Sequence, residues 1–261
     1  MRASSPFLAD HHGKASAPKA ALNILLVSIA LSAVFWVSLS RIGVTFDFGI
    51  FSGLEGRLLD GFLMTLALSA VSLVLSTAIG IACAFGQNAR ILVIRYVCSG
   101  YVTFMRGTPL IMQIFLFFYI IGTAWGITNR FIAGVLILSL FEGAYVAEII
   151  RGSFLSVDAT QIEAAQSVGF TKRQTLRHVI IPQMMARTLP ALAGQFASII
   201  KDSSLLSIIA VIELTQTMRE ISAANYHLFE CYLLLGVLYL CLTLPITFIS
   251  KRLEKRFDYA S

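Results

Sequence analysis

The sequence predicts an all-α membrane protein with about six transmembrane helices and both termini in the cytoplasm. Composition is the first reason: 57% of the 261 residues are hydrophobic and only 13% are charged, whereas about a quarter of a soluble domain is charged. The second reason is a series of apolar runs of about 20 residues, the length that crosses a bilayer as a helix. The third is the placement of Lys and Arg, which favours one side of these runs.

Six runs are expected to span the membrane. In chain order they cover residues 20–40, 61–89, 107–129, 131–150, 188–212 and 231–250. Four of the runs contain no charged residue. The fourth run contains Glu142 and Glu148, and the fifth is interrupted by Lys201 and Asp202. Because a charge near the bilayer centre is costly and usually faces a cavity or a partner, these four residues are the first candidates for function.

Basic residues set the expected orientation. With the N-terminus inside, fifteen Lys and Arg residues fall in cytoplasmic segments and four fall outside, while Lys201 lies within a span. Positive loops are retained in the cytoplasm, so the net charge of +6 reports topology, and nucleic acid is not an expected partner. The first run could instead be a cleaved signal peptide, with small residues at Ser38 and Ser40. It is longer than the apolar region of such peptides, so a retained span is favoured.

The longest polar connection, residues 151–187, is expected to form a helix, a glycine turn and a second helix. Asp158 followed by Gln161 is typical of a helix N-terminus, and Gly169 suits the left-handed residue that ends a helix. A Thr-x-x-Gln capping pair follows directly, and Pro182 is expected to stop the second helix. The pair could lie on anionic lipid, read DNA or dock on a cytoplasmic partner. DNA is disfavoured because both ends join membrane spans.

This loop carries a pattern at several positions. Its members are Glu163, Ala164, Ala165, Gly169, Val179, Ile181 and Pro182. The pattern resembles the signature loop in permease subunits of ATP-binding cassette importers, where Glu-Ala-Ala is followed by a glycine and by an aliphatic-x-Leu-Pro ending. At two positions of that ending this chain has Val179 and Ile181, which are conservative in size and polarity. Segments 105–110, 144–148 and 201–205 resemble the polar amino acid branch of that family, and the resemblance covers about residues 55–256.

The resemblance implies the type I importer permease fold with an extra N-terminal helix. On that basis the chain divides into a cytoplasmic tail, the extra transmembrane helix, a permease domain with a cytoplasmic coupling loop, and a second cytoplasmic tail. The ranges are 1–19, 20–40, 58–250 with the loop at 151–187, and 251–261. The resemblance also implies a multi-pass protein in the bacterial plasma (inner) membrane, surrounded by lipid.

The resemblance further implies that the loop docks on a cytoplasmic ATPase subunit dimer. The contact residues that it implies are Glu163, Ala164, Ala165, Gly169, Arg173 and Pro182. The chain has no G-x-x-x-x-G-K-[ST] phosphate loop, so ATP and Mg are expected on the partner ATPase, with no cofactor, metal or catalytic residue in this chain. The other implied partners are a second permease chain, identical or merely similar, and an extracytoplasmic solute-binding protein that delivers an amino acid.

The substrate pathway is expected along the polar residues of the fourth and fifth spans. The candidates are Glu142, Lys201, Asp202, Ser203 and Ser204. A broken helix at a cavity could meet the ammonium and carboxylate of an amino acid. A Lys–Asp pair that only holds the break together is equally open, and Glu142 could instead bond a neighbouring helix. A local ion pair with Arg151 is expected for Glu148, and Arg106 is expected to anchor the inner interface.

The alternative function is an ATP-independent secondary transporter or channel. The lack of an internal repeat and the presence of the loop pattern argue against it. A membrane-embedded enzyme is less favoured again, because the sequence has no H-E-x-x-H or G-x-S-x-G motif. The four cysteines have no metal-binding spacing.

Overall fold

The structure is a computed structural model that describes residues 17–43 and 45–258. Within those ranges the chain forms helices joined by turns and contains no β-strand. Contacts divide the chain into two units with the boundary between Asp47 and Phe48, and each unit is considered by itself. Most of the expected tail 1–19, and the end of the tail 251–261, lie outside the described residues.

The described residues of the first unit form one helix, α1 (Ala17–Ile42). It coincides with the expected span at residues 20–40, and Pro18–Ile42 is long and apolar enough to cross a membrane. Its large apolar side chains, Trp36 among them, are exposed. A helix that is apolar on every face needs apolar surroundings on every face, and a bilayer supplies them.

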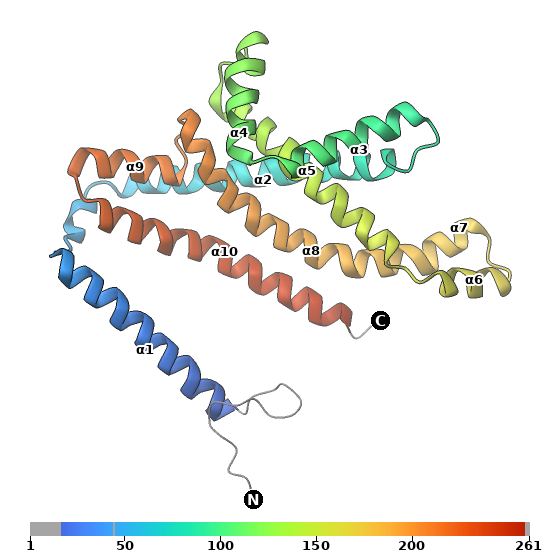
Figure 1. The fold of residues 1–261 in the computed structure, drawn as a ribbon, viewed down its shortest axis with the longest axis horizontal. Helices are drawn as coiled ribbons and strands as arrows, with labels where there is room; N and C mark the ends of the chain where they lie inside the picture. Colours follow the sequence, from blue (N-terminus) through green and yellow to red (C-terminus); the bar gives the residue numbers. More distant parts are fainter. Residues whose placement is uncertain (1–16, 44, 259–261) are drawn as a thin grey trace, which may run out of the picture. The chain divides into compact units, whose positions relative to one another are not determined.

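Two long helices form the centre of the second unit, α2 (Glu55–Gly86) and α5 (Arg130–Leu155). Small residues let their backbones approach. A Cβ atom added to Gly80 would lie 2.4 Å from Cγ1 of Val146, so a larger residue would push the helices apart. Close packing through small residues is the usual basis of helix association in lipid. In Figure 1 these helices run in the same general direction as α8 and α10.

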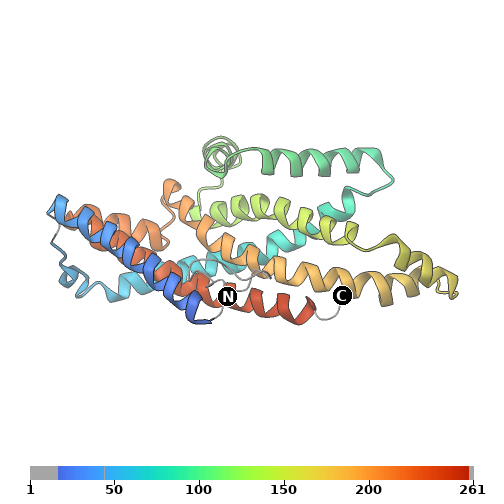
Figure 2. The ribbon, with the colours of Figure 1, turned by 60° about the horizontal axis from the view of Figure 1, so that its bottom comes forward.

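A helix that the sequence analysis missed follows α2. Residues 90–106 are expected to be a cytoplasmic connection, but α3 (Leu92–Gly107) forms there and buries Val102 and Met105 against α5. The expectation was wrong because Arg95 and Arg106 interrupt the apolar run. Figure 2 shows α3 alongside α5.

The expected third span, 107–129, is also replaced by a different arrangement. Helix α4 (Leu110–Phe115) continues as a π-helical segment, η2 (Leu116–Gly122), and is bent by 114° from α3. Pro109 cannot donate a helix hydrogen bond and holds Thr108 extended. The buried Gln113 amide compensates by donating to the carbonyl oxygens of Met105 at 2.9 Å and Thr108 at 3.3 Å.

The long connection forms the helix–turn–helix that the sequence predicts. It contains α6 (Ala159–Ser167), α7 (Lys172–Thr175) and the π-helical turn η3 (Leu176–Ile180). Pro182 does not stop the second helix, contrary to expectation. It lies in the first turn of α8 (Ile181–Asp202), and helical structure is continuous from α7 to the end of α8. The wide π turn accommodates the missing N–H group of proline.

The expected fifth span, 188–212, breaks near its middle. Helix α8 ends at Asp202, and the 3₁₀ segment η4 (Ser203–Ile209) follows. Ala210 takes a left-handed conformation with φ of 54° before α9 begins. The remaining elements are η1 (Phe48–Phe51), α9 (Leu214–Asn225) and α10 (Leu228–Asp258). In Figure 1, α9 lies at one end of this unit and the α6–α7 hairpin at the other.

Length and composition identify fewer spans than the sequence analysis expected. Four helices in the described ranges qualify, namely α1, α2, α5 and α10, and the bent α3–α4 pair raises the number to five. Helix α8 does not qualify, since Arg187, Lys201 and Asp202 lower its apolar character. The number of six spans stays a prediction.

Candidate functional site

The α6–α7 hairpin is shaped by local hydrogen bonds. The Asp158 carboxylate accepts the backbone N–H of Thr160 at 2.9 Å, and this bond holds the pKa of the carboxyl below its usual range. Gly169 has φ of +86°, which an L side chain rarely adopts. Thr171 and Gln174 then cap α7 reciprocally, the Thr171 hydroxyl accepting the Gln174 N–H and the Gln174 side chain accepting the Thr171 N–H.

The hairpin exposes most of the residues that the family pattern contains. Exposed members are Glu163, Ala164, Gly169, Arg173 and Pro182, whereas Ala165 is buried. Sequence reasoning missed two apolar neighbours of the glycine turn: Val168 is 74% exposed and Phe170 is 38% exposed. Exposed large apolar side chains beside a turn indicate a surface that binds a partner. The Val-Gly-Phe sequence at 168–170 is a signal that could have identified them.

Two contacts tie the beginning of α8 to its neighbours, one to the hairpin and one to the end of α5. The Gln183 amide donates to Gln161 of α6. The Arg187 guanidinium donates to the carbonyl oxygen of Ser156, just after α5, at 2.7 Å. The beginning of α8 is therefore joined both to the hairpin and to the end of α5.

At the break after α8, the expected pathway residues separate into two groups. Glu142 of α5 is fully buried, and its Oε2 accepts a hydrogen bond from the Gln195 amide. Among the described residues, its Oε1 has no hydrogen-bonded partner, and the half-buried Asp202 carboxyl of α8 is its acidic neighbour. The break therefore brings an acidic side chain of α5 close to one of α8.

Lys201 faces a different space. It lines a cavity of about 310 Å³ together with Ser204, and α9 and α10 supply the other walls, including Thr215 and Tyr239. No ion pair joins Lys201 to Asp202 in the structurally described part of the chain. Ser203 is turned to its own helix, where its hydroxyl donates to the Ile200 carbonyl oxygen at 2.8 Å.

A further buried acid, Glu213, was missed by the sequence analysis. It caps α9 by accepting the N–H groups of Thr215 and Gln216, each at 2.8 Å, and it accepts the Tyr239 hydroxyl of α10 at 3.0 Å. Both carboxylate oxygens of Glu213 thus accept hydrogen bonds within the fold, and the bond from Tyr239 holds α9 against α10.

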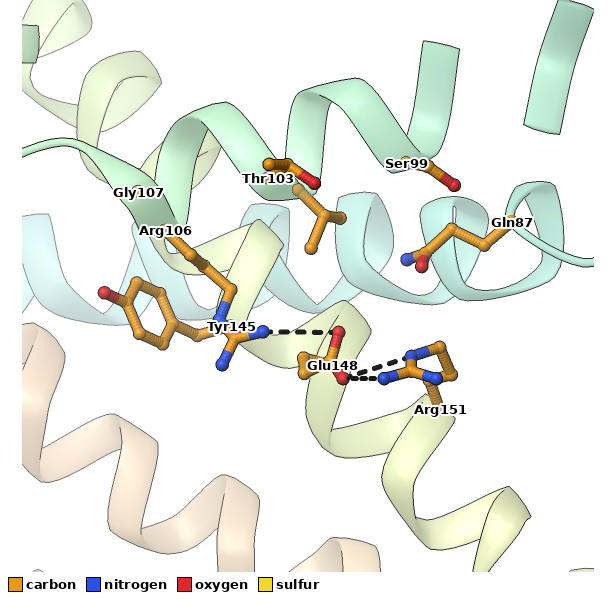
Figure 3. Close-up of a pocket in the computed structure, with 9 residues that line it drawn as sticks. Gln87, Ser99, Thr103, Arg106, Gly107, Tyr145, Glu148 and Arg151 are labelled. Atoms are coloured by element: carbon orange, nitrogen blue, oxygen red, sulfur yellow. Dashed lines mark hydrogen bonds and ion pairs between the residues drawn. The ribbon is translucent and has the colours of Figure 1, made fainter. Parts of the chain in front are cut away.

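Another polar cluster lies where α2, α3 and α5 meet (Figure 3). The Glu148 carboxylate binds Arg151, as expected, and also lies 3.3 Å from Nη1 of Arg106. The Arg106 guanidinium lies 5.5 Å from the centre of the Tyr145 ring. These four side chains line a cavity of about 520 Å³. Arg106 thus joins α3 to α5 through Glu148 and lines this cavity.

Comparison with known proteins places this geometry in a family. Residues 76–259 match the family described as the binding-protein-dependent transport system inner membrane component. The chain belongs to this family. A relative from Bacillus subtilis, named as the probable glutamine ABC transporter permease protein GlnM, is 33% identical over 203 residues, covering 76% of this chain and 94% of its own. The glutamine transport system permease protein GlnP of Escherichia coli is 34% identical, covering 76% and 92%.

Solved structures agree with this family membership. One chain, from a crystal structure of an amino acid ABC transporter with histidines, has a TM-score of 0.76 and 34% identity, with 82% of this chain and all of that chain covered. A chain of the MetNI methionine ABC transporter has a TM-score of 0.65 at 18% identity and supports the fold alone. The predicted fold class, an all-α importer permease, is confirmed.

Proposed function

We propose that this chain is the membrane permease subunit of an ATP-driven importer for polar amino acids in the bacterial inner membrane. The observation that carries the proposal is the likeness, at 33% and 34% identity over nearly the whole length of the relatives, to permeases named for glutamine transport. The chain would give substrate a path through the bilayer and would take its energy from a separate subunit.

The α6–α7 hairpin is the surface that would meet the ATPase dimer. The hairpin presents Glu163, Ala164, Gly169 and Arg173 on the outside, with the apolar Val168 among them. The Gln183 contact joins it to α8, and Arg187 joins α8 to the end of α5, so displacement of the hairpin would move these helices as well. ATP and Mg would be held by the ATPase.

The break after α8 is the part that would face the substrate. Asp202 would offer an acidic group at the break, while Lys201 and Ser204 would offer donors from the cavity beside α9 and α10. Glu142, which is fully buried, would support the break from behind through its contact with Gln195. An amino acid carries one ammonium and one carboxylate, so both groups would find partners of opposite charge at this level. A second permease chain would complete the pathway, and an extracytoplasmic binding protein would deliver the substrate.

Purification of the tagged chain from its native membranes tests the proposal. We expect an ATPase to be recovered with it, and to be lost on the combined change Glu163→Ala and Gly169→Val. When the recovered complex is reconstituted in vesicles with the binding protein, glutamine uptake should require ATP on the side of the hairpin. Uptake that proceeds without any nucleotide would instead support a secondary transporter.

A further inference from the structure

The cavity between α2, α3 and α5 carries more positive than negative charge. Its walls contain two guanidinium groups, those of Arg106 and Arg151, and one carboxylate, that of Glu148. Both guanidinium groups share that carboxylate: Arg151 binds Oε1 and Arg106 lies near Oε2. One positive charge therefore remains without a balancing acid in the cavity, and each guanidinium has five N–H donors, so donors are left over.

Other donors lie around the same space. The Gln87 side-chain nitrogen is buried and has no hydrogen-bonded partner within residues 17–43 and 45–258, which is a costly state for an amide nitrogen. Ser99 and Thr103 of α3 line the cavity as well. Figure 3 shows these side chains on the walls around the Arg106–Glu148–Arg151 cluster. Many donors with a surplus positive charge match an oxyanion with several acceptor atoms.

The surroundings of the cavity favour an oxyanion with an apolar tail. The cavity lies near the ends of α2 and α5 that are predicted to face the cytoplasm, where lipid headgroups lie. The first half of α3 exposes Val93, Tyr96 and Val97 to the outside, and acyl chains would cover such a surface. Basic cavities between helices on the cytoplasmic side are typical places for anionic headgroups.

We propose that this cavity is a phosphate-binding site that holds the headgroup of an anionic phospholipid through Arg106 and Arg151. The phosphate competes with Glu148 for Arg106. Because that contact joins α3 to α5, and α5 leads directly into the α6–α7 hairpin, lipid binding alters how firmly α3 is held to the helix that carries the hairpin.

Native mass spectrometry of the purified full chain in detergent tests the site without any transport measurement. The chain is mixed with equal amounts of phosphatidylglycerol, which is anionic, and phosphatidylcholine, which is neutral overall. We expect the wild type to retain phosphatidylglycerol preferentially. Arg106→Gln and Arg151→Gln should each reduce that retention about tenfold, since each removes a charge-assisted contact.

Two further variants separate binding from folding. Glu148→Gln removes the competing carboxylate and should increase retention of phosphatidylglycerol, the opposite of what a damaged fold would give. Arg90→Gln removes an exposed charge that does not line the cavity and should leave retention unchanged. The proposal is overturned by equal retention of the two lipids in the wild type, by a loss with Arg90→Gln as large as with Arg106→Gln, or by a loss with Glu148→Gln.

Inorganic phosphate distinguishes the source of the anion. If millimolar phosphate added alone raises the unfolding temperature of the wild type but not of Arg106→Gln, and phosphatidylglycerol does not, the lipid assignment is wrong and the site takes free phosphate. If phosphatidylglycerol stabilises the wild type and free phosphate does not, the lipid assignment is supported.

Discussion

At the scale of single residues, the sequence identifies polar groups in apolar segments but not their neighbours. Glu142 stands out in the sequence, yet its partner Gln195 is 53 residues away and follows only from the packing of α5 against α8. Lys201 and Asp202 are adjacent in the chain, and consecutive side chains on a helix point about 100° apart. The structure accordingly places them in different environments, and no ion pair joins them in the described residues.

Lys201→Ala tests whether the cavity beside α10 belongs to the substrate path. Because Lys201 lines that cavity and makes no ion pair with Asp202, its removal should leave the fold intact while it removes a cation from the path. We expect uptake of amino acid to fall about tenfold, with unchanged amounts of protein in the membrane. Lys251→Ala, an exposed change on α10, is the matched control, and equal uptake by the two variants would make Lys201 a structural residue.

At the scale of elements, local signals were read correctly and long-range ones were not. The capping pair at Thr171 and the glycine turn depend on residues within a few positions, and both are confirmed. The continuation past Pro182 was missed because a π turn leaves no simple pattern. Helix α3 was missed because Arg106 interrupts its apolar run. The acidic partner of that arginine, Glu148, lies on another helix and is not apparent from the local sequence.

The glycine turn provides a prediction at this scale. Gly169 has no atom within 4 Å of an added Cβ, so a side chain there would not collide with the fold, but φ of +86° would cost a β-branched residue roughly 1–2 kcal/mol. We expect Gly169→Val to distort the hairpin and to weaken recovery of the ATPase. Asn adopts this conformation more readily, so Gly169→Asn should retain the ATPase. Equal behaviour of the two variants would show that the shape of the turn does not matter.

At the scale of the molecule, the close approach of α2 and α5 organises the permease unit. The family and fold class could be predicted from apolar runs and from the loop pattern, because both are properties of the chain alone. The pairing of α2 with α5 could not, since it depends on which small residues meet across helices. The break at Pro109 has a local cause, but the bonds from Gln113 that complete it appear only in the structure.

The substitution Gly80→Ala tests how much the close packing of α2 against α5 contributes to stability. The added Cβ would meet Val146, and overpacking of this kind typically costs about 1–3 kcal/mol. We expect a lower unfolding temperature in detergent. Gly100→Ala is the control, since no atom lies within 4 Å of its Cβ on α3, and alanine favours helix by about 1 kcal/mol. Its unfolding temperature should stay the same or rise, and a matching decrease in both variants would count against the packing argument.

The uninterrupted helical stretch from Lys172 to Asp202 has a mechanical consequence. At 1.5 Å per residue it is about 45 Å long. One end lies in the hairpin and the other lies at the break after Asp202, so it can act as a lever arm. A tilt of about 5° would displace the far end by about 4 Å, roughly three-quarters of the pitch of one helical turn. A small angular stroke delivered to the hairpin would thus be amplified into a displacement large enough to open or close a passage beside Lys201 and Asp202.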